Sequence, residues 1–341
     1  MDRRFEPVRD QDTGWTVWGQ PRAVRDLQRA VVQGPGHSWI LTGPGGSGKH
    51  LAALSFAKAL CCPNRPSHSA AACETCSVCG RIERGVFPDV TEFSLARQSL
   101  REGARSRNLT LNVATVREVA AAVSYRPAEA AWKIVIVRDA ETMQETAQEA
   151  FLKTLEEPPP YAVILLLTDD LEPVLPTIQS RCIVARFGEV NISEVARALS
   201  AAGVGETQSA EIASLANGCI GWAFQAARDD ELLATRQREL NEARVLVASS
   251  EYDRLTTCIR LADEFARNRD ATFQMLALAQ QVWRSQLNLL LGPTSERPDH
   301  GKAAQVVAAI RSVDRCVANL EANVRPRLAM EAMVSDWPTV P

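Results

Sequence analysis

The stretch Gly43-Pro-Gly-Gly-Ser-Gly-Lys-His50 decides the fold predicted for this chain. It fits the pattern G-x-x-x-x-G-K of a phosphate-binding loop. A short apolar run, Ser38–Thr42, precedes the loop, and an alanine-rich segment with apolar residues at helical spacing, residues 51–60, follows it. The sequence therefore predicts a strand, a glycine-rich loop and a helix, with backbone amides directed at phosphate oxygens.

Position 50 departs from this pattern. A Ser or Thr after the loop lysine would ligate Mg²⁺ through its hydroxyl, which His50 lacks. We therefore expect the loop to accept ATP or ADP while binding Mg²⁺ weakly. The candidate nucleotide-binding residues in the loop are Gly43, Gly45, Gly46, Gly48, Lys49 and His50.

Two continuous apolar runs, Lys133–Val137 and residues 162–167, show no alternation of polar and apolar residues. Such runs are typical of strands that are covered on both faces of a parallel sheet. The chain is thus predicted to contain an α/β domain that ends near residue 188. From residue 192 onward every segment has helical periodicity, which predicts a small helical unit over 189–230 and a larger helical bundle over 231–341.

The end of the first apolar run also departs from an active ATPase. In P-loop ATPases a strand of this kind ends in two carboxylates, one for Mg²⁺ and one that polarises the attacking water. Here Arg138, Asp139, Ala140 and Glu141 follow the run. Either Arg138 takes the metal-side position, or the register slips by one and Asp139 takes it with Ala140 in place of the base. Each register removes one carboxylate, and in a third interpretation the acidic residues only begin a solvated helix.

Composition and charge agree with an ordinary globular protein. The 341 residues are 46% hydrophobic and 23% charged, which suffices for two or three domains. The net charge of -3 provides no overall basic field, so contact with nucleic acid would depend on a local patch or on partner subunits. Residues 1–7 lack the apolar segment of a secretory signal, and no apolar run approaches the roughly 18 residues of a membrane helix. We expect a cytoplasmic chain without a membrane contact.

Four of the nine cysteines form a cluster that is typical of a metal site. Cys73, Cys76 and Cys79 follow each other at C-x-x-C spacing, and Cys62 can supply a fourth thiolate across an intervening loop. Four cysteines suit a closed, tetrahedral and therefore structural Zn²⁺ site, which we place in a module at about 61–80. Iron-sulfur ligation and free thiols are the alternatives, and the adjacent Cys61 is a second candidate for the fourth ligand.

Arg181 is the candidate catalytic residue. It lies in Ser180-Arg-Cys182, after a Thr-Ile-Gln turn, between small residues that leave its guanidinium free to project. A planar, permanently charged group with several donors suits a γ-phosphate better than a lysine does. The alternative is a surface arginine in a local ion pair. The pair Glu156-Glu157 precedes prolines and is interpreted as a structural helix end.

With Lys153-Thr-Leu-Glu-Glu-Pro-Pro159 and Ser180-Arg-Cys182, the chain resembles the bacterial DNA polymerase III clamp-loader subunits of the AAA+ class. Gly19-Gln20 and His37 before the phosphate loop also match, as does Asn323-Val-Arg-Pro-Arg-Leu328. The resemblance covers nearly the whole chain. It implies an AAA+ domain with a zinc insertion, followed by a helical lid over 189–230 and an oligomerising helical collar over 231–341.

The resemblance also implies partners and roles. In such loaders five AAA+ subunits form a hetero-pentameric spiral that opens a sliding clamp and loads it onto primer-template DNA. His50, Arg138 and the region near Gly221, where motor subunits carry a nucleotide-sensing arginine in a Gly-x-x-Arg context, all depart from the ATP-hydrolysing motors. The chain thus looks like the stator, which braces the delta subunit and offers its arginine, here Arg181, to the ATP of an adjacent tau/gamma motor. The same resemblance aligns Thr168 with the γ-phosphate sensor and favours Cys62 over Cys61 as a zinc ligand.

Two other functions remain open. An active motor ATPase of the same loader is distinguished from the stator by the residues at positions 50 and 138. An unrelated P-loop phosphotransferase would not need the Ser-Arg-Cys motif, a zinc insertion and an all-helical C-terminal third together. Nothing resembles a polymerase site, so we expect the chain to belong to the DNA polymerase III holoenzyme without carrying polymerase or independent ATPase activity.

Overall fold

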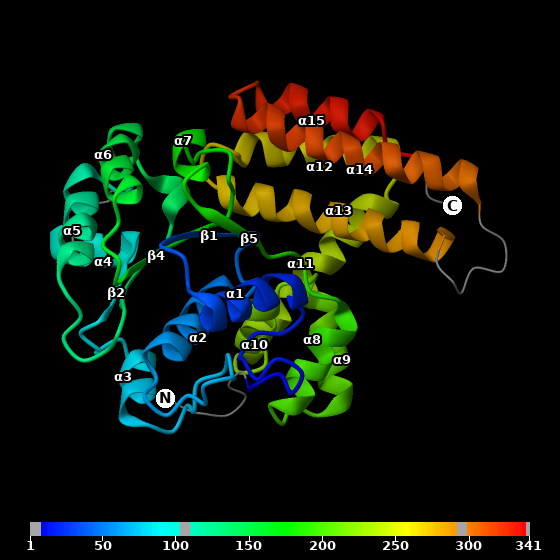
Figure 1. Cartoon of the computed structure of the whole chain (residues 1–341). Helices are drawn as coiled ribbons and strands as arrows, with labels where there is room; N and C mark the ends of the chain where they lie inside the picture. Colours follow the sequence, from blue (N-terminus) through cyan, green and yellow to red (C-terminus); the bar gives the residue numbers. More distant parts are fainter. Residues whose placement is uncertain (1–7, 103–109, 292–298, 339–341) are drawn as a thin grey trace. The chain divides into compact units, whose positions relative to one another are not determined.

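A computed structural model describes residues 8–102, 110–291 and 299–338 of the chain (Figure 1). Its internal contacts divide the chain into two compact units, Met1–Arg228 and Asp229–Pro341. None of the helices within the described ranges is long and apolar enough to cross a membrane.

The first unit is built on a parallel sheet of five strands in the order β2-β3-β4-β1-β5. The strands are β1 (Ser38–Thr42), β2 (Val90–Phe93), β3 (Lys133–Val137), β4 (Ala162–Thr168) and β5 (Ile183–Arg186). In the centre of the sheet, Thr42 at the end of β1 pairs with Thr168 of β4 on one side and Arg186 of β5 on the other. The carboxyl ends of these strands therefore meet at one edge, which is where open α/β sheets bind ligands.

Helices cover both faces of this sheet. The helices of the first unit are α1 (Pro21–Gln33), α2 (Lys49–Cys61), α3 (Ser77–Glu83), α4 (Leu95–Glu102), α5 (Val113–Ser124), α6 (Glu145–Glu156), α7 (Pro176–Gln179), α8 (Ile192–Ala201), α9 (Glu206–Ala216) and α10 (Ile220–Ala226), with a 3₁₀ turn, η1, at Ala140–Thr142. In Figure 1, α1 and α2 lie on one side of the sheet, and α5 and α6 lie on the other.

The strand residues explain this layered arrangement. Ile134 and Ile136 of β3 pack into a core with α1 and α2, whereas Val135 and Val137 pack into a second core with α5 and α6. All residues of β1, β3 and β4 are buried, which is why their sequences are continuously apolar. The predicted α/β fold, with a phosphate loop on a parallel sheet, is confirmed. The short edge strand β5 was not predicted.

The second unit is helical throughout its described residues. Its helices are α11 (Asp230–Ala248), α12 (Glu251–Glu264), α13 (Arg269–Leu291), α14 (His300–Glu321) and α15 (Pro326–Ser335). Trp283 of α13 meets Trp337 edge-on, with ring centroids 5.5 Å apart. The indole Nε1 of Trp337 donates to Ser312 Oγ at 3.1 Å, and the buried Arg254 guanidinium lies 5.6 Å from the Trp337 ring. These contacts hold α12, α13 and α14 together around the chain segment that follows α15.

Candidate nucleotide-binding site

The phosphate loop connects β1 to α2, and its glycines are required by its backbone. Gly46 and Gly48 have φ values of 74° and 98°, in the left-handed region that other residues avoid. At Gly43 a Cβ atom would lie 2.0 Å from the carbonyl oxygen of Phe187. Because α2 begins at Lys49, the loop ends at a helix N-terminus, where the partial positive charge favours an anion.

The Gln20 side chain stabilises the phosphate loop through hydrogen bonds. Its buried side-chain amide donates to the carbonyls of Ser47 at 3.2 Å and Gly188 at 2.7 Å, and its Oε1 accepts from the Gly188 N–H at 3.1 Å. The side chain thereby ties the phosphate loop to the segment that follows β5. The sequence motif Gly19-Gln20 is thus part of the site's framework.

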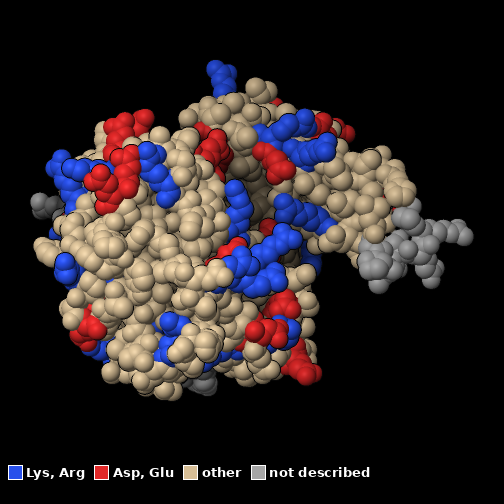
Figure 2. Space-filling model, in the orientation of Figure 1, with Lys and Arg blue, Asp and Glu red and all other residues tan. Residues whose placement is uncertain are grey.

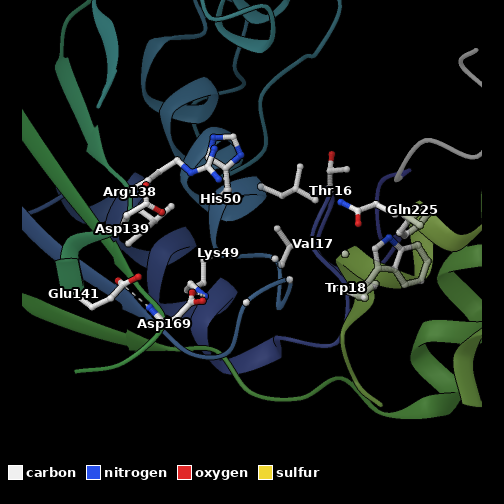
Figure 3. A pocket seen from close by; sticks show the side chains of 18 of the residues that line it. Thr16, Val17, Trp18, Lys49, His50, Arg138, Asp139, Glu141, Asp169 and Gln225 are labelled. Atoms are coloured by element: carbon white, nitrogen blue, oxygen red, sulfur yellow. Dashed lines mark hydrogen bonds and ion pairs between the residues drawn. The ribbon is translucent and has the colours of Figure 1, made fainter. Parts of the chain in front are cut away.

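The loop lysine has partners within the chain. The Lys49 side chain is only 8% exposed, and its Nζ donates to the carbonyls of Gly43 and Pro44 and pairs with Asp169 Oδ1 at 2.8 Å. Figure 3 shows Lys49 and Asp169 side by side. The other carboxylate oxygen of Asp169 lies 3.1 Å from where a Cβ atom of Gly45 would be. A phosphate that enters the loop must therefore replace the Asp169 carboxylate on Lys49.

Glu92 of β2 joins the two basic residues that depart from the motor pattern. Its Oε2 lies 3.1 Å from His50 Nε2, and its Oε1 lies 3.3 Å from an Arg138 nitrogen. Burial raises the pKa of the Glu92 carboxyl, but the hydrogen bonds and charges of His50 and Arg138 outweigh it and lower that pKa to about 2. Where an active site would gather ligands for Mg²⁺, this chain places an imidazole and a guanidinium on one carboxylate.

The two acidic residues after β3 also line this pocket, and each accepts a hydrogen bond from a backbone N–H. Asp139 has a φ of 57°, and its Oδ2 accepts from the Leu95 N–H at 3.0 Å, at the start of α4. The Glu141 carboxylate accepts from the Asp169 N–H at 3.2 Å. Arg138 and Asp139 both line the pocket, so which of them takes the metal-side position stays a prediction.

Thr168 is fully buried at the end of β4, and its hydroxyl donates to the carbonyl of Asp170. Its neighbour Asp169 contacts Lys49 instead. Sensing of a γ-phosphate by Thr168 remains a prediction, and it requires this hydroxyl to leave the Asp170 carbonyl.

The helical segment that contains α10 closes over the loop. The Gly221 N–H donates to the Gly46 carbonyl at 2.8 Å, and the Cys219 thiol donates to the Gly45 carbonyl at 3.3 Å. Phe224 stands three residues after Gly221, where a Gly-x-x-Arg pattern would have its arginine, and it lines the same pocket. At the position where motor subunits carry the arginine, α10 therefore presents the apolar side chain of Phe224 to the pocket.

Together these residues enclose a pocket of about 500 Å³ between the phosphate loop and α10 (Figure 3). Lys49, His50 and Arg138 line one part of it, and Val17 and Trp18 line another. The pocket has a basic end at the phosphate loop and an apolar end, a combination that suits a nucleotide. Of the predicted nucleotide-binding residues, Gly45, Gly46, Gly48, Lys49 and His50 line this pocket together with Arg138, whereas Gly43 and Thr168 do not line it.

The four predicted zinc ligands also come together. The sulfur atoms of Cys62, Cys73, Cys76 and Cys79 all lie within 4.8 Å of one another. Cys62 Sγ is 3.5 Å from Cys73 Sγ and 3.9 Å from Cys76 Sγ. A regular tetrahedron of Zn–S bonds of about 2.3 Å has sulfurs about 3.8 Å apart, so these distances fit a bound Zn²⁺.

Cys61 points away from this cluster. Its thiol lies 3.9 Å from the Trp132 carbonyl, and burial raises its pKa to about 12, which keeps it protonated. Cys62 caps the end of α2, and the buried Lys58 of the same helix pairs with Glu74 at 2.6 Å. The cysteine module is thereby attached to the helix that begins at the phosphate loop.

Arg181 lies outside the nucleotide pocket of its own chain, as far as the described residues define that pocket. It follows α7, and its guanidinium bonds Glu156 Oε1 at 2.6 Å, the Thr177 carbonyl at 2.8 Å and Ser180 Oγ at 3.4 Å. The side chain is 35% exposed and that of Glu156 is 49% exposed. Such exposed pairs contribute about 0 to 1 kcal/mol to stability, so the pair is a weak structural device.

Three contributors to these sites were not singled out from the sequence as site residues: Asp169, Glu92 and Glu156. Asp169 has a recognisable signal, because a polar residue directly after a buried parallel strand lies at the ligand-binding edge of the sheet. For Glu92 and Glu156 the sequence carries no such signal, since their partners are distant in the chain.

Comparison with known proteins relates this chain to subunits of DNA polymerase III. A family model described as "DNA polymerase III, delta subunit" matches residues 19–191, which is half of the chain. DNA polymerase III subunit tau of Bacillus subtilis is 32% identical over 53% of this chain and 29% of its own length. Subunit gamma of Buchnera aphidicola is 31% identical over 49% of this chain and 42% of its own length.

Subunit delta' of Pseudomonas aeruginosa is 35% identical over 43% of this chain and 42% of its own length. The matched segments thus span less than half of these relatives. Relatives with all three subunit names match, so similarity does not separate one subunit type from another.

Proposed function

The chain belongs to the family described as DNA polymerase III, delta subunit, and we propose that within it this chain is the delta-prime subunit, the stator of a clamp loader. In this role it helps to load a sliding clamp onto primed DNA during replication. Its partners are the delta and tau/gamma subunits of a hetero-pentamer, and through them the clamp and the primer-template DNA.

One observation carries the proposal that this chain does not hydrolyse ATP. His50 and Arg138 share the Glu92 carboxylate beside the phosphate loop, where an active ATPase gathers oxygen ligands for Mg²⁺. The Arg138 guanidinium at this place repels a divalent metal, and the Glu92 carboxylate is already paired with it. The pocket retains the loop and Lys49, so ATP or ADP remains an acceptable ligand.

The active contribution of the chain is Arg181, as an arginine finger on the ATP of an adjacent motor subunit. Its exposed guanidinium, its place outside the described pocket of its own chain and its Ser-Arg-Cys motif support this role. The three-part organisation belongs to the same proposal, with an AAA+ domain over 1–188, a lid over 189–230 and a collar over 231–341. Cys62, Cys73, Cys76 and Cys79 hold a structural Zn²⁺.

The relatives named tau and gamma support one alternative, an ATP-hydrolysing motor subunit of the same loader. ATP turnover by the isolated full-length chain, with saturating Mg²⁺, distinguishes the two functions. We expect no turnover above that of a Lys49→Ala variant, because His50 offers no hydroxyl to Mg²⁺ and Arg138 repels the ion. Turnover of about 0.1 per second or more that Lys49→Ala abolishes would show a motor instead.

A further inference from the structure

The arginine proposed as a finger is held by a second side chain from another element. Arg181 follows α7, and Glu156 is the last residue of α6, so they are 25 residues apart in the chain. We propose that Glu156 is a positioning residue, which orients the Arg181 guanidinium for the nucleotide of a neighbouring subunit. This inference rests on the proposed role of Arg181 in trans.

The contacts fix the guanidinium from one side. One terminal nitrogen donates to the Thr177 carbonyl and to Ser180 Oγ, and the other donates to Glu156 Oε1 at 2.6 Å. Among the described residues no acceptor is found for the Nε–H of Arg181. At least one donor therefore remains for an oxygen that approaches from outside the chain.

The charge of Glu156 matters more than its packing. Both side chains are substantially exposed, so the carboxylate removes little apolar surface from water. A charge-assisted hydrogen bond of this length restricts a side chain that otherwise loses considerable rotamer freedom when it engages a phosphate. Because the anchors are the end of α6 and the turn of α7, the restriction is applied before the partner binds, as preorganisation requires.

The opposite role would be a competing anion that keeps Arg181 away from the phosphate. The contacts favour positioning, because Glu156 takes only one of the guanidinium's several donors and the Thr177 carbonyl holds the other terminal nitrogen independently. Removal of the carboxylate should therefore slow the reaction in trans. If Glu156 were a competitor, its removal would accelerate that reaction.

Glu157 provides a matched control. It is the adjacent residue of the same type, it is exposed, and its carboxylate makes no hydrogen bond or ion pair with any described residue. Glu156→Gln and Glu157→Gln should be compared in the clamp loader reconstituted with its delta and motor subunits, by DNA-stimulated ATP turnover at varied ATP. We expect Glu156→Gln to lower kcat by about threefold or more with KM for ATP unchanged, and Glu157→Gln to match wild type.

A double variant separates positioning from a general structural effect. In the Arg181→Ala background, Glu156→Gln should have no additional effect on kcat, because its action passes through the missing guanidinium. Glu156→Asp should recover part of the lost rate. An unchanged or increased kcat for Glu156→Gln, or an equal loss in the Arg181→Ala background, would overturn the inference. If Arg181→Ala itself left kcat unchanged, the proposed finger would fail, which is a distinct result.

Discussion

Glu92 is the residue on which the character of the nucleotide site depends. A motor ATPase neutralises phosphate charge with Mg²⁺, whereas this chain places two basic side chains beside the phosphate loop. Without Glu92, His50 and Arg138 would face each other with no anion between them. The Glu92 carboxylate therefore stabilises the two basic side chains beside the phosphate loop, and its pairing with them disfavours binding of a divalent cation.

Substitution of Glu92 by Gln should lower the free energy of unfolding at neutral pH. The pKa of Glu92 in the folded chain is about 2, below its ordinary value of 4.5, so its charge stabilises the folded state. This contribution is fully present above about pH 4.5 and is lost as the pH falls toward 2. Partial exposure screens the charges, so we expect a loss of about 1 to 2 kcal/mol at pH 7.

Urea unfolding of wild type and Glu92→Gln between pH 7 and pH 3.5 measures this difference. The difference in the free energy of unfolding between wild type and Glu92→Gln should be constant down to about pH 5 and should decrease below pH 4.5. Glu149→Gln is the control, because the Glu149 carboxylate is exposed and makes no hydrogen bond or ion pair with a described residue. This variant should unfold with the same free energy as wild type at each pH. A Glu92→Gln variant as stable as wild type at every pH would contradict this account of the site.

At the scale of elements, α2 connects the two candidate sites of the first unit. It begins at Lys49 in the phosphate loop and ends at Cys61, one residue before the zinc ligand Cys62. Lys58 on this helix and Glu74 in the cysteine segment form a largely buried ion pair. The cysteine segment thus contacts the far end of the helix that begins at the phosphate loop.

Loss of zinc should loosen residues 62–79 and lower the thermal stability of the chain, because structural zinc contributes directly to folding. We expect the purified protein to contain about one equivalent of zinc, and Cys76→Ser to contain little and to exchange its amides faster in this segment. Elemental analysis and hydrogen exchange measure both effects. Cys61→Ala, outside the cluster, should keep its zinc, and visible iron-sulfur absorbance or a metal-free wild-type protein would refute the assignment.

Elements that depend on local pattern could be predicted from the sequence. The strand, loop and helix around the phosphate loop follow from apolar spacing and glycine positions, and the four clustered thiols lie within a short segment. The ion pairs could not be predicted in this way. Lys49 and Asp169 are 120 residues apart, and they meet only because the strand order places β4 beside β1. Glu92 reaches Arg138 for the same reason, since β2 pairs with β3.

At the scale of the whole molecule, charge is the relevant property. On the face shown in Figure 2, basic and acidic side chains are interspersed. The net charge of -3 provides no overall basic field, so contact with nucleic acid would depend on a local patch or on partner subunits. Its own pocket and Arg181 then have separate roles. In the proposed function the pocket does not hydrolyse ATP, and the arginine acts on the nucleotide of a partner subunit.

The most direct test of this account compares two variants in the reconstituted clamp loader, at matched subunit occupancy and with DNA-stimulated ATP turnover as the readout. Arg181→Ala should lower turnover at least about tenfold, since a finger in trans contributes about 10³ to 10⁵ in rate. Lys49→Ala, which removes the chain's own phosphate lysine, should leave turnover unchanged, provided that its melting temperature shows it to be folded. The reverse pattern, with Lys49→Ala inactive and Arg181→Ala unaffected, would contradict the account and identify the chain as a motor.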